Sequence, residues 1–226
     1  MGDAIGQMLP SAVGIAISPM PMIAVILMLA TPKGRTNGLA FAAGWTVSLA
    51  VAATVLVLLG TGADAADVDG GPAAWTSWLK LALGVLFILL AFKQFRGRPR
   101  EGHPTPIPKW MAAIDRFTPG KAVGLAALLA VANPKNLVLL LGGAVAIAGS
   151  GADTGGKTVA VVVMVLVASL CTAVPVTVFL FGGARTAGIL GGWKTWMSAH
   201  SAAIMAVLFA VLGSKYVGDA VSGLSA

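Results

Sequence analysis

The chain has 226 residues, of which 58% are hydrophobic and 10% are charged, and its mean hydropathy is +0.91. About a quarter of the residues of a soluble domain are charged, so this composition excludes a soluble globular protein and indicates an integral membrane protein. The net charge of +7 does not indicate a nucleic-acid partner. Much of the excess lies in one loop beside the apolar runs, where positive charge meets anionic lipid.

Six apolar stretches are long enough to cross a bilayer, which takes roughly 20 helical residues. They cover residues 5–30, 38–60, 74–95, 121–149, 158–182 and 198–221. Two of them contain proline near the middle, as Ser18-Pro19-Met20-Pro21 in the first and Asn133-Pro134-Lys135-Asn136 in the fourth. Proline removes a backbone donor and clashes with the preceding turn. We therefore predict that the first and fourth helices are broken at these points, which hydrocarbon tolerates only where protein or a water-filled cavity covers the break.

The connections between the predicted spans alternate in charge. The basic ones, which are the first, third and fifth, are residues 31–37, 96–120 and 183–197. The second connection carries three aspartates and no base, and the fourth is balanced. Because basic connections face the cytoplasm, we predict that the loop with Lys33 and Arg35 is cytoplasmic and that both termini are extracytoplasmic.

The six spans divide into two groups of three. An odd number of spans in each half forces the second half to insert upside down relative to the first, and Pro19 and Pro134 then occupy equivalent places near the bilayer midplane. This is the inverted-repeat plan of many secondary transporters, although prolines are also common in membrane helices generally. The predicted units are a first three-helix repeat (1–95), a basic cytoplasmic linker (96–120) and a second, inverted repeat (121–226).

Within the linker, residues 109–117 have one apolar and one charged face, which predicts a short helix lying at the membrane interface. This helix would be a membrane-surface anchor or a partner surface.

The middle of each predicted span lacks Asp and Glu. Metal-cation carriers need hard oxygen ligands or imidazole, and proton relays usually run through buried carboxylates or histidine. The sequence also has no hydrolase elbow, phosphate loop or zinc motif. We therefore expect no enzyme activity, no metal site and no cofactor.

Lys135 lies at the break in the fourth span, too deep for its side chain to reach the headgroups easily, and a charge there is a functional hypothesis by default. Asn133 and Asn136 offer donors and acceptors, and a half-helix that starts after Pro134 presents free N–H groups that favour anions. We predict a cradle for a phosphate, sulfate or carboxylate, with Ser18 facing it as a hydroxyl donor. The alternative is that Lys135 caps carbonyls of the neighbouring half-helix.

The predicted substrate-binding residues are Ser18, Pro19, Pro21, Asn133, Pro134, Lys135 and Asn136. Polar residues in the second and fifth spans are candidates for lining a path to the cradle, with a kinking proline as a hinge. These residues are Thr46, Ser48, Ser169, Thr172 and Pro175. Hydroxyl side chains in membrane helices often bond to their own helix instead.

Two short motifs carry a family resemblance. Pro19-Met20-Pro21 resembles the proline pair in the first helix of the lysine-exporter superfamily of small translocators, and Asn133-Pro134-Lys135 resembles its Asn-Pro-Lys in the fourth helix. Together with the Thr31-Pro32-Lys33-Gly34-Arg35 turn and residues 38–45, these motifs make the chain similar to the GAP family. This family contains the peptidoglycolipid and sulfolipid addressing proteins of actinobacterial envelopes.

The resemblance implies a six-helix protein of the bacterial inner membrane, with inverted repeats, that moves an envelope lipid or glycolipid toward the outside. Metal-exporting branches of the superfamily use acidic or histidine residues in the membrane, which this chain lacks at the middle of its spans. Amino-acid exporting branches share Asn-Pro-Lys and remain possible.

Three functions follow as hypotheses. The first is a lipid translocator whose cradle takes a polar or anionic headgroup while the acyl chains stay in the bilayer. The second is an exporter of a small solute, either an amino acid or an organic anion. The third is a non-transporting accessory subunit of an envelope-lipid export machine. The expected partners are membrane lipids, an envelope glycolipid, and a second copy of the chain or a larger export complex.

Overall fold

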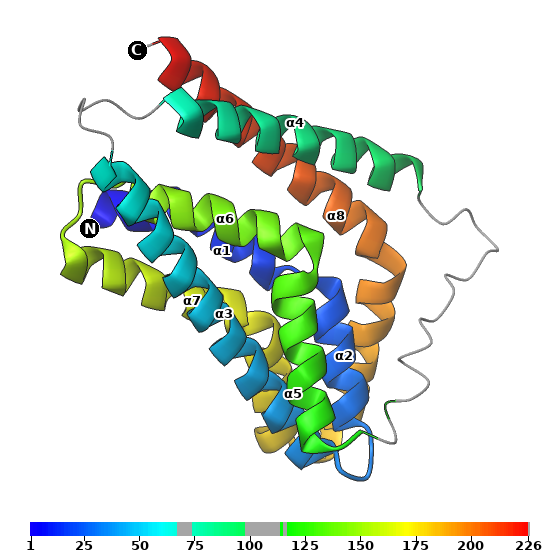
Figure 1. Cartoon of the computed structure of the whole chain (residues 1–226). Helices are drawn as coiled ribbons and strands as arrows, with labels where there is room; N and C mark the ends of the chain where they lie inside the picture. Colours follow the sequence, from blue (N-terminus) through cyan, green and yellow to red (C-terminus); the bar gives the residue numbers. More distant parts are fainter. Residues whose placement is uncertain (67–73, 98–113, 115–116, 226) are drawn as a thin grey trace.

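The computed structural model describes residues 1–66, 74–97, 114 and 117–225. Every regular element in this part of the chain is helical, as Figure 1 shows. In chain order, the elements are α1 (Gly2–Ala16), α2 (Pro19–Leu29), α3 (Gly34–Ala66), α4 (Ala74–Arg96), α5 (Pro119–Ala127), the π-helical turn η2 (Leu128–Ala132), α6 (Pro134–Ala148), α7 (Thr154–Phe181), the 3-10 turn η3 (Gly183–Arg185) and α8 (Thr186–Ser225).

Both proline breaks are present. Helices α1 and α2 meet at an angle of 47°, and the helix formed by α5 and η2 meets α6 at 63°. Ser18 and Asn133 precede the prolines that start α2 and α6, and both have extended backbones, with ψ of 112° and 117°. The cause is local, because a residue before proline is driven out of the α-helical region.

The described residues contain four candidate membrane spans, or up to six if each bent pair forms one span. Helices α3, α4, α7 and α8 are individually long and apolar enough, and each bent pair counts as a further candidate span. The last helix differs from the prediction, because α8 begins at Thr186 and includes most of the connection predicted over 183–197. Hydropathy marks the part of a helix that suits the membrane, and a helix can continue beyond it.

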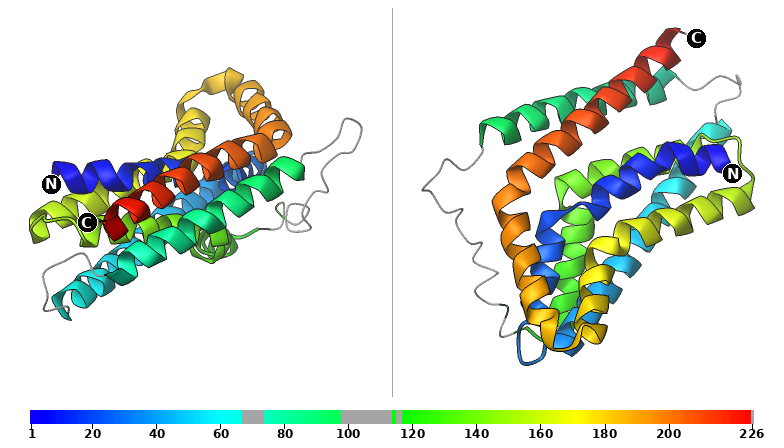
Figure 2. Two further views of the ribbon diagram at one scale, coloured as in Figure 1. Left: turned by 90° about the horizontal axis from the view of Figure 1, so that it is seen from above. Right: turned by 180° about the vertical axis from the view of Figure 1, so that it is seen from behind.

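The broken spans pack across the molecule. Helix α1 contacts α6 and α7, and α5 contacts α3; α2 also contacts α7, and α6 contacts α3. Figure 2 shows α4 lying along the C-terminal half of α8, which is its main partner. The two helices approach closely where a Cβ on Gly213 would lie 3.0 Å from the carbonyl oxygen of Gly84, which is the small-residue packing that membrane helices favour.

The two ends of the molecule carry different connections. Both termini lie at the end that also carries the α6–α7 connection (Figures 1 and 2). The opposite end carries the α2–α3 connection, the start of α5 and η3. Basic residues mark this opposite end: Lys33, Arg35, Lys121 and Arg185 belong to these segments.

The outward side chains suit a lipid environment. Leu58, Leu59 and Phe181 are 65%, 66% and 83% exposed, although each is large and apolar. The predicted interfacial helix over 109–117 lies outside the described residues except for Ile114, which is buried, and Phe117. The backbone oxygen of Phe117 accepts a hydrogen bond from Asn37 Nδ2 at 2.9 Å, so the end of the linker is attached to α3.

Candidate substrate site at the helix breaks

The two breaks meet inside the molecule. Lys135 Nζ, in the first turn of α6, donates to Ser18 Oγ at 2.5 Å, and Ser18 is the residue that precedes α2. Ser18 Oγ donates in turn to Asn136 Oδ1 at 3.4 Å. The exposed fractions of Ser18, Lys135 and Asn136 are 3%, 6% and 0%. The structure therefore brings together three of the predicted site residues in a closed cluster, which we call the cradle.

The two asparagines stabilise the break in the backbone. Asn136 Nδ2 donates to the carbonyl oxygen of Leu129 at 2.8 Å, within the irregular turn η2. Asn133 Oδ1 accepts from the backbone N–H of Lys135 at 3.1 Å, as an N-cap residue does. The N–H of Lys135 is therefore not one of the free donors expected at the start of α6, because Asn133 Oδ1 accepts from it.

The prolines shape the cradle without donating to it. Pro19 and Pro21 are both buried, and Pro19 and Pro134 each occupy the first position of their helix, where a missing N–H costs least. They end one helix and start the next at the point where Ser18 and Lys135 meet.

Lys135 has no acidic partner among the described residues. In the part of the chain that the structure describes, the only ion pair joins Lys215 to Asp219, and the hydrogen bond of Lys135 Nζ goes to a neutral hydroxyl. A buried charge without a counter-charge costs several kcal/mol, on the order of the desolvation penalty of one ion. An anion beside Lys135 would supply the counter-charge that no described residue provides.

The predicted path residues fall into two groups. Thr46 Oγ1 lies within hydrogen-bond distance of Ser169 Oγ, at 3.0 Å, and it is also 3.0 Å from the carbonyl oxygen of Ala42 in its own helix. Next to it, Trp45 Nε1 donates to the carbonyl oxygen of Ala168 at 3.3 Å. The two contacts between the helices hold α3 against α7 at a point we call the α3–α7 crossing. The Thr46 and Ser169 hydroxyls thus face each other across the two helices.

The remaining path residues are not at this crossing. Thr172 is buried and donates to the carbonyl oxygen of Ser169 in its own helix at 3.0 Å. Ser48 is half-buried and has no hydrogen-bond partner among the described side chains. Pro175 is buried in α7, which continues through it from Thr154 to Phe181; its role as a hinge stays a prediction.

An apolar cavity of about 390 Å³ lies beside the cradle, between the first broken span, α7 and α8. Its lining includes Met22, Trp193 and Trp196 together with Cys171. Cys171 is 1% exposed.

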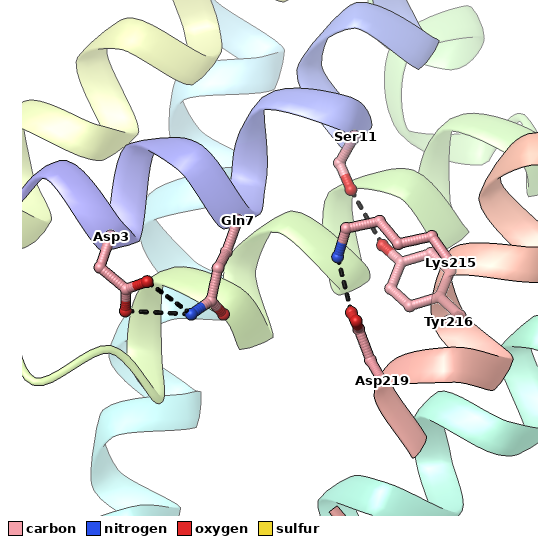
Figure 3. Close-up of polar contacts among 6 residues, drawn as sticks. All are labelled: Asp3, Gln7, Ser11, Lys215, Tyr216 and Asp219. Atoms are coloured by element: carbon pink, nitrogen blue, oxygen red, sulfur yellow. Dashed lines mark hydrogen bonds and ion pairs between the residues drawn. The ribbon is translucent and has the colours of Figure 1, made fainter. Parts of the chain in front are cut away.

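Sequence reasoning missed a second polar cluster at the end that carries the termini. Ser11 and Tyr216 share a hydrogen bond of 2.9 Å, and Lys215 Nζ lies 2.6 Å from Asp219 Oδ2, as Figure 3 shows. Two signals were available. Tyr216 is the only tyrosine of the chain, and Asp219 is an acidic residue inside the predicted span 198–221.

The fold and the cradle define a class: a multi-pass helical membrane protein with a buried polar site where two broken helices meet. The sequence model of one family, described as Sap, sulfolipid-1-addressing protein, matches residues 8–222, and the chain belongs to this family. This agrees with the resemblance to sulfolipid addressing proteins. No curated protein and no solved structure matches the chain.

Proposed function

We propose that the protein is a translocator of the bacterial inner membrane that exports or flips an envelope lipid with a polar or anionic headgroup. The observation that carries this proposal is the ammonium of Lys135, which is buried at the meeting point of two broken helices with a hydroxyl as its partner and no carboxylate. A sulfate or phosphate would supply the missing charge. The family's description, which names a sulfolipid, supports a lipid substrate at a coarse level.

The proposal includes two inverted repeats with extracytoplasmic termini. Reciprocal packing supports the repeats, because α1 contacts α7 as α5 contacts α3, and α2 contacts α7 as α6 contacts α3. The distribution of charge supports the orientation. The end with the α2–α3 connection carries Lys33, Arg35 and Arg185, and basic ends face the cytoplasm.

The proposed mechanism begins with exchange of partners in the cradle. An anionic headgroup takes the place of Ser18 Oγ at Lys135 Nζ, while Asn136 keeps the carbonyl of Leu129 occupied. The acyl chains stay in the bilayer and in the apolar cavity beside Cys171. Rocking of one repeat against the other about the α3–α7 crossing then opens the cradle to the opposite side. A gradient or a partner protein supplies the energy, and a second copy or a larger export complex is the expected assembly.

The test is transport of a fluorescent anionic lipid, sulfated or phosphorylated in its headgroup, in liposomes that contain the purified full-length protein. We expect Lys135→Ala to abolish movement across the bilayer. Lys121→Ala is the matched control, because Lys121 is an exposed lysine at the start of α5. Undiminished transport by Lys135→Ala at normal expression would refute the cradle as the substrate site.

The same assay separates the other two functions. Movement of an amino acid or organic anion in place of any lipid would replace the proposal with a small-solute exporter. A correctly folded protein that transports nothing alone and co-purifies with a larger exporter would replace the proposed translocator with an accessory subunit.

A further inference from the structure

A polar cleft of about 610 Å³ opens at the end of the molecule that carries both termini. It lies between α1, α4 and α8, and we call it the terminal cleft. Its lining includes the side chains of Asp3, Gln7, Lys80, Lys215, Asp219 and Ser222. Figure 3 shows four of these side chains, those of Asp3 and Gln7 on α1 and of Lys215 and Asp219 on α8. Its volume is that of a typical small-molecule site, and it sits at the ends of spanning helices, where lipid headgroups are found.

Two charges in the terminal cleft are not neutralised. Lys215 and Asp219 pair with each other at 2.6 Å. Both carboxylate oxygens of Asp3 accept from Gln7 Nε2 at 3.0 Å, which holds the carboxylate in place but leaves its charge. Lys80 has neither an ion pair nor a hydrogen bond among the described residues. Asp3 and Lys80 therefore present opposite charges from α1 and α4 without reaching each other.

We propose that the terminal cleft binds a zwitterionic lipid headgroup of the phosphoethanolamine class. The ammonium of the headgroup lies at Asp3 and its phosphate at Lys80. A purely anionic group in this cleft would gain from Lys80 but be repelled by Asp3, and a purely cationic group would meet the reverse. A ligand with a positive and a negative group a few bonds apart is attracted by both Asp3 and Lys80. A ligand with only one kind of charge is repelled by one of them, because like charges brought together in a site oppose binding.

The terminal cleft is separate from the cradle. Tyr216 lines a smaller neighbouring pocket that shares Gln7, Lys80, Lys215 and Asp219 with the cleft. The Tyr216 hydroxyl shares a buried hydrogen bond with Ser11, and further along the same helix α1 is packed tightly at Gly14. A Cβ there would lie 3.1 Å from the side chain of Leu139 and 3.3 Å from that of Leu212, and both leucines are buried. An apolar layer therefore divides the two polar sites, and the zwitterion site does not depend on the proposed translocation.

Competitive lipid retention tests this proposal. The full chain is purified from vesicles that contain equal amounts of phosphatidylethanolamine, phosphatidylcholine and phosphatidylglycerol, and the bound lipids are counted by native mass spectrometry. We expect retention of phosphatidylethanolamine over phosphatidylglycerol. We also expect retention over phosphatidylcholine, whose trimethylated nitrogen cannot donate to Asp3. Asp3→Asn or Lys80→Gln should each lower the ratio of phosphatidylethanolamine to total lipid by about two- to fivefold, the effect of one partly exposed ion pair.

The two single variants should change the retention of phosphatidylglycerol in opposite directions. Asp3→Asn should increase it and Lys80→Gln should decrease it. The double variant Asp3→Lys with Lys80→Asp, which exchanges the two charges, should restore the preference for the zwitterion. Lys135→Ala should leave the preference intact, which separates this site from the cradle. Unchanged lipid ratios in both single variants would overturn the proposal. Asp3 would then be only an acid at the start of a helix, and Lys80 a lysine reaching toward the headgroups.

Discussion

The ammonium of Lys135 and the hydroxyl of Ser18 are 117 positions apart in the sequence and 2.5 Å apart in the structure. Each belongs to a residue beside a helix-breaking proline, Pro134 for the lysine and Pro19 for the serine. The bond therefore joins the two breaks, and it satisfies the donor of Lys135 without neutralising its charge. In the proposed function, an anionic headgroup does both, and this bond is the contact that it replaces.

A built-in counter-charge should block the cradle. Ser18→Asp places a carboxylate beside Lys135 Nζ, so we expect a more stable protein that transports the anionic lipid at least about tenfold more slowly, as hydrogen bonds to charged groups contribute about 1.5–3 kcal/mol. Ser18→Asn is the matched control, since it has the same size and no charge. Liposome transport and the melting temperature in detergent are the two readouts. Equal transport by the two variants would contradict a role for the charge of Lys135.

Removing the buried charge should separate stability from activity. Lys135→Met keeps most of the side-chain length and loses the ammonium, while Ser18 retains Asn136 as a partner. We expect the free energy of unfolding to stay the same or to rise by about 1–3 kcal/mol, because a buried charge is replaced by an apolar group. We expect lipid transport to be lost. A large loss of stability would show that Lys135 serves the fold.

Cys171 is a natural reporter of access to the cradle, because it is the only cysteine in the chain and is 1% exposed. We expect a membrane-permeant maleimide to label it at least about tenfold more slowly in the folded protein than in denaturant, since labelling requires local opening. Transported lipid should speed the labelling, and Ser18→Asp should slow it. Cys171→Ala, which has no cysteine, measures the background labelling. Labelling of the folded protein at the denatured rate would exclude the closed cradle.

The bond between Ser11 and Tyr216 depends on a glycine. A Cβ on Gly142 would collide with the hydroxyl of Tyr216, so Gly142→Ala must displace this side chain from Ser11. We expect a loss of about 1–3 kcal/mol, the usual effect of overpacking. Gly218→Ala, at a position of α8 where a Cβ meets nothing within 4 Å, should be neutral or stabilising by up to about 1 kcal/mol. Melting temperatures of the two variants measure this difference. An equal change in both would contradict the dependence of the Ser11–Tyr216 bond on Gly142.

Local rules explain which parts of the structure could be predicted. Proline acts on its own turn and on the residue before it, so the breaks at Ser18 and Asn133 follow from sequence alone. The matched placement of the breaks was enough to predict that Ser18 faces Lys135. The capping of Lys135 N–H by Asn133 could also have been anticipated, because asparagine before a helix is a preferred N-cap.

Other features depend on which helix faces which. Ser11 meets Tyr216, and Asn37 meets the backbone of Phe117, through contacts between distant segments that composition and hydropathy do not specify. Asp3, Gln7 and Ser11 do follow one another at intervals of four along α1, which places them on one face. That spacing gave no information on α4 and α8, which complete the terminal cleft.

The packing of the helices also bears on how the chain is assembled in the membrane. Helix α4 finds its main partner in α8, and α1 packs on α6 and α7, whereas the contacts within residues 1–96 are few beyond α2 with α3. The first half of the chain therefore lacks a core of its own. Its helices can reach their final packing only after the second half has been synthesised and inserted. Folding is in this sense a docking reaction between two incomplete halves, and separately expressed halves should recover their structure only together.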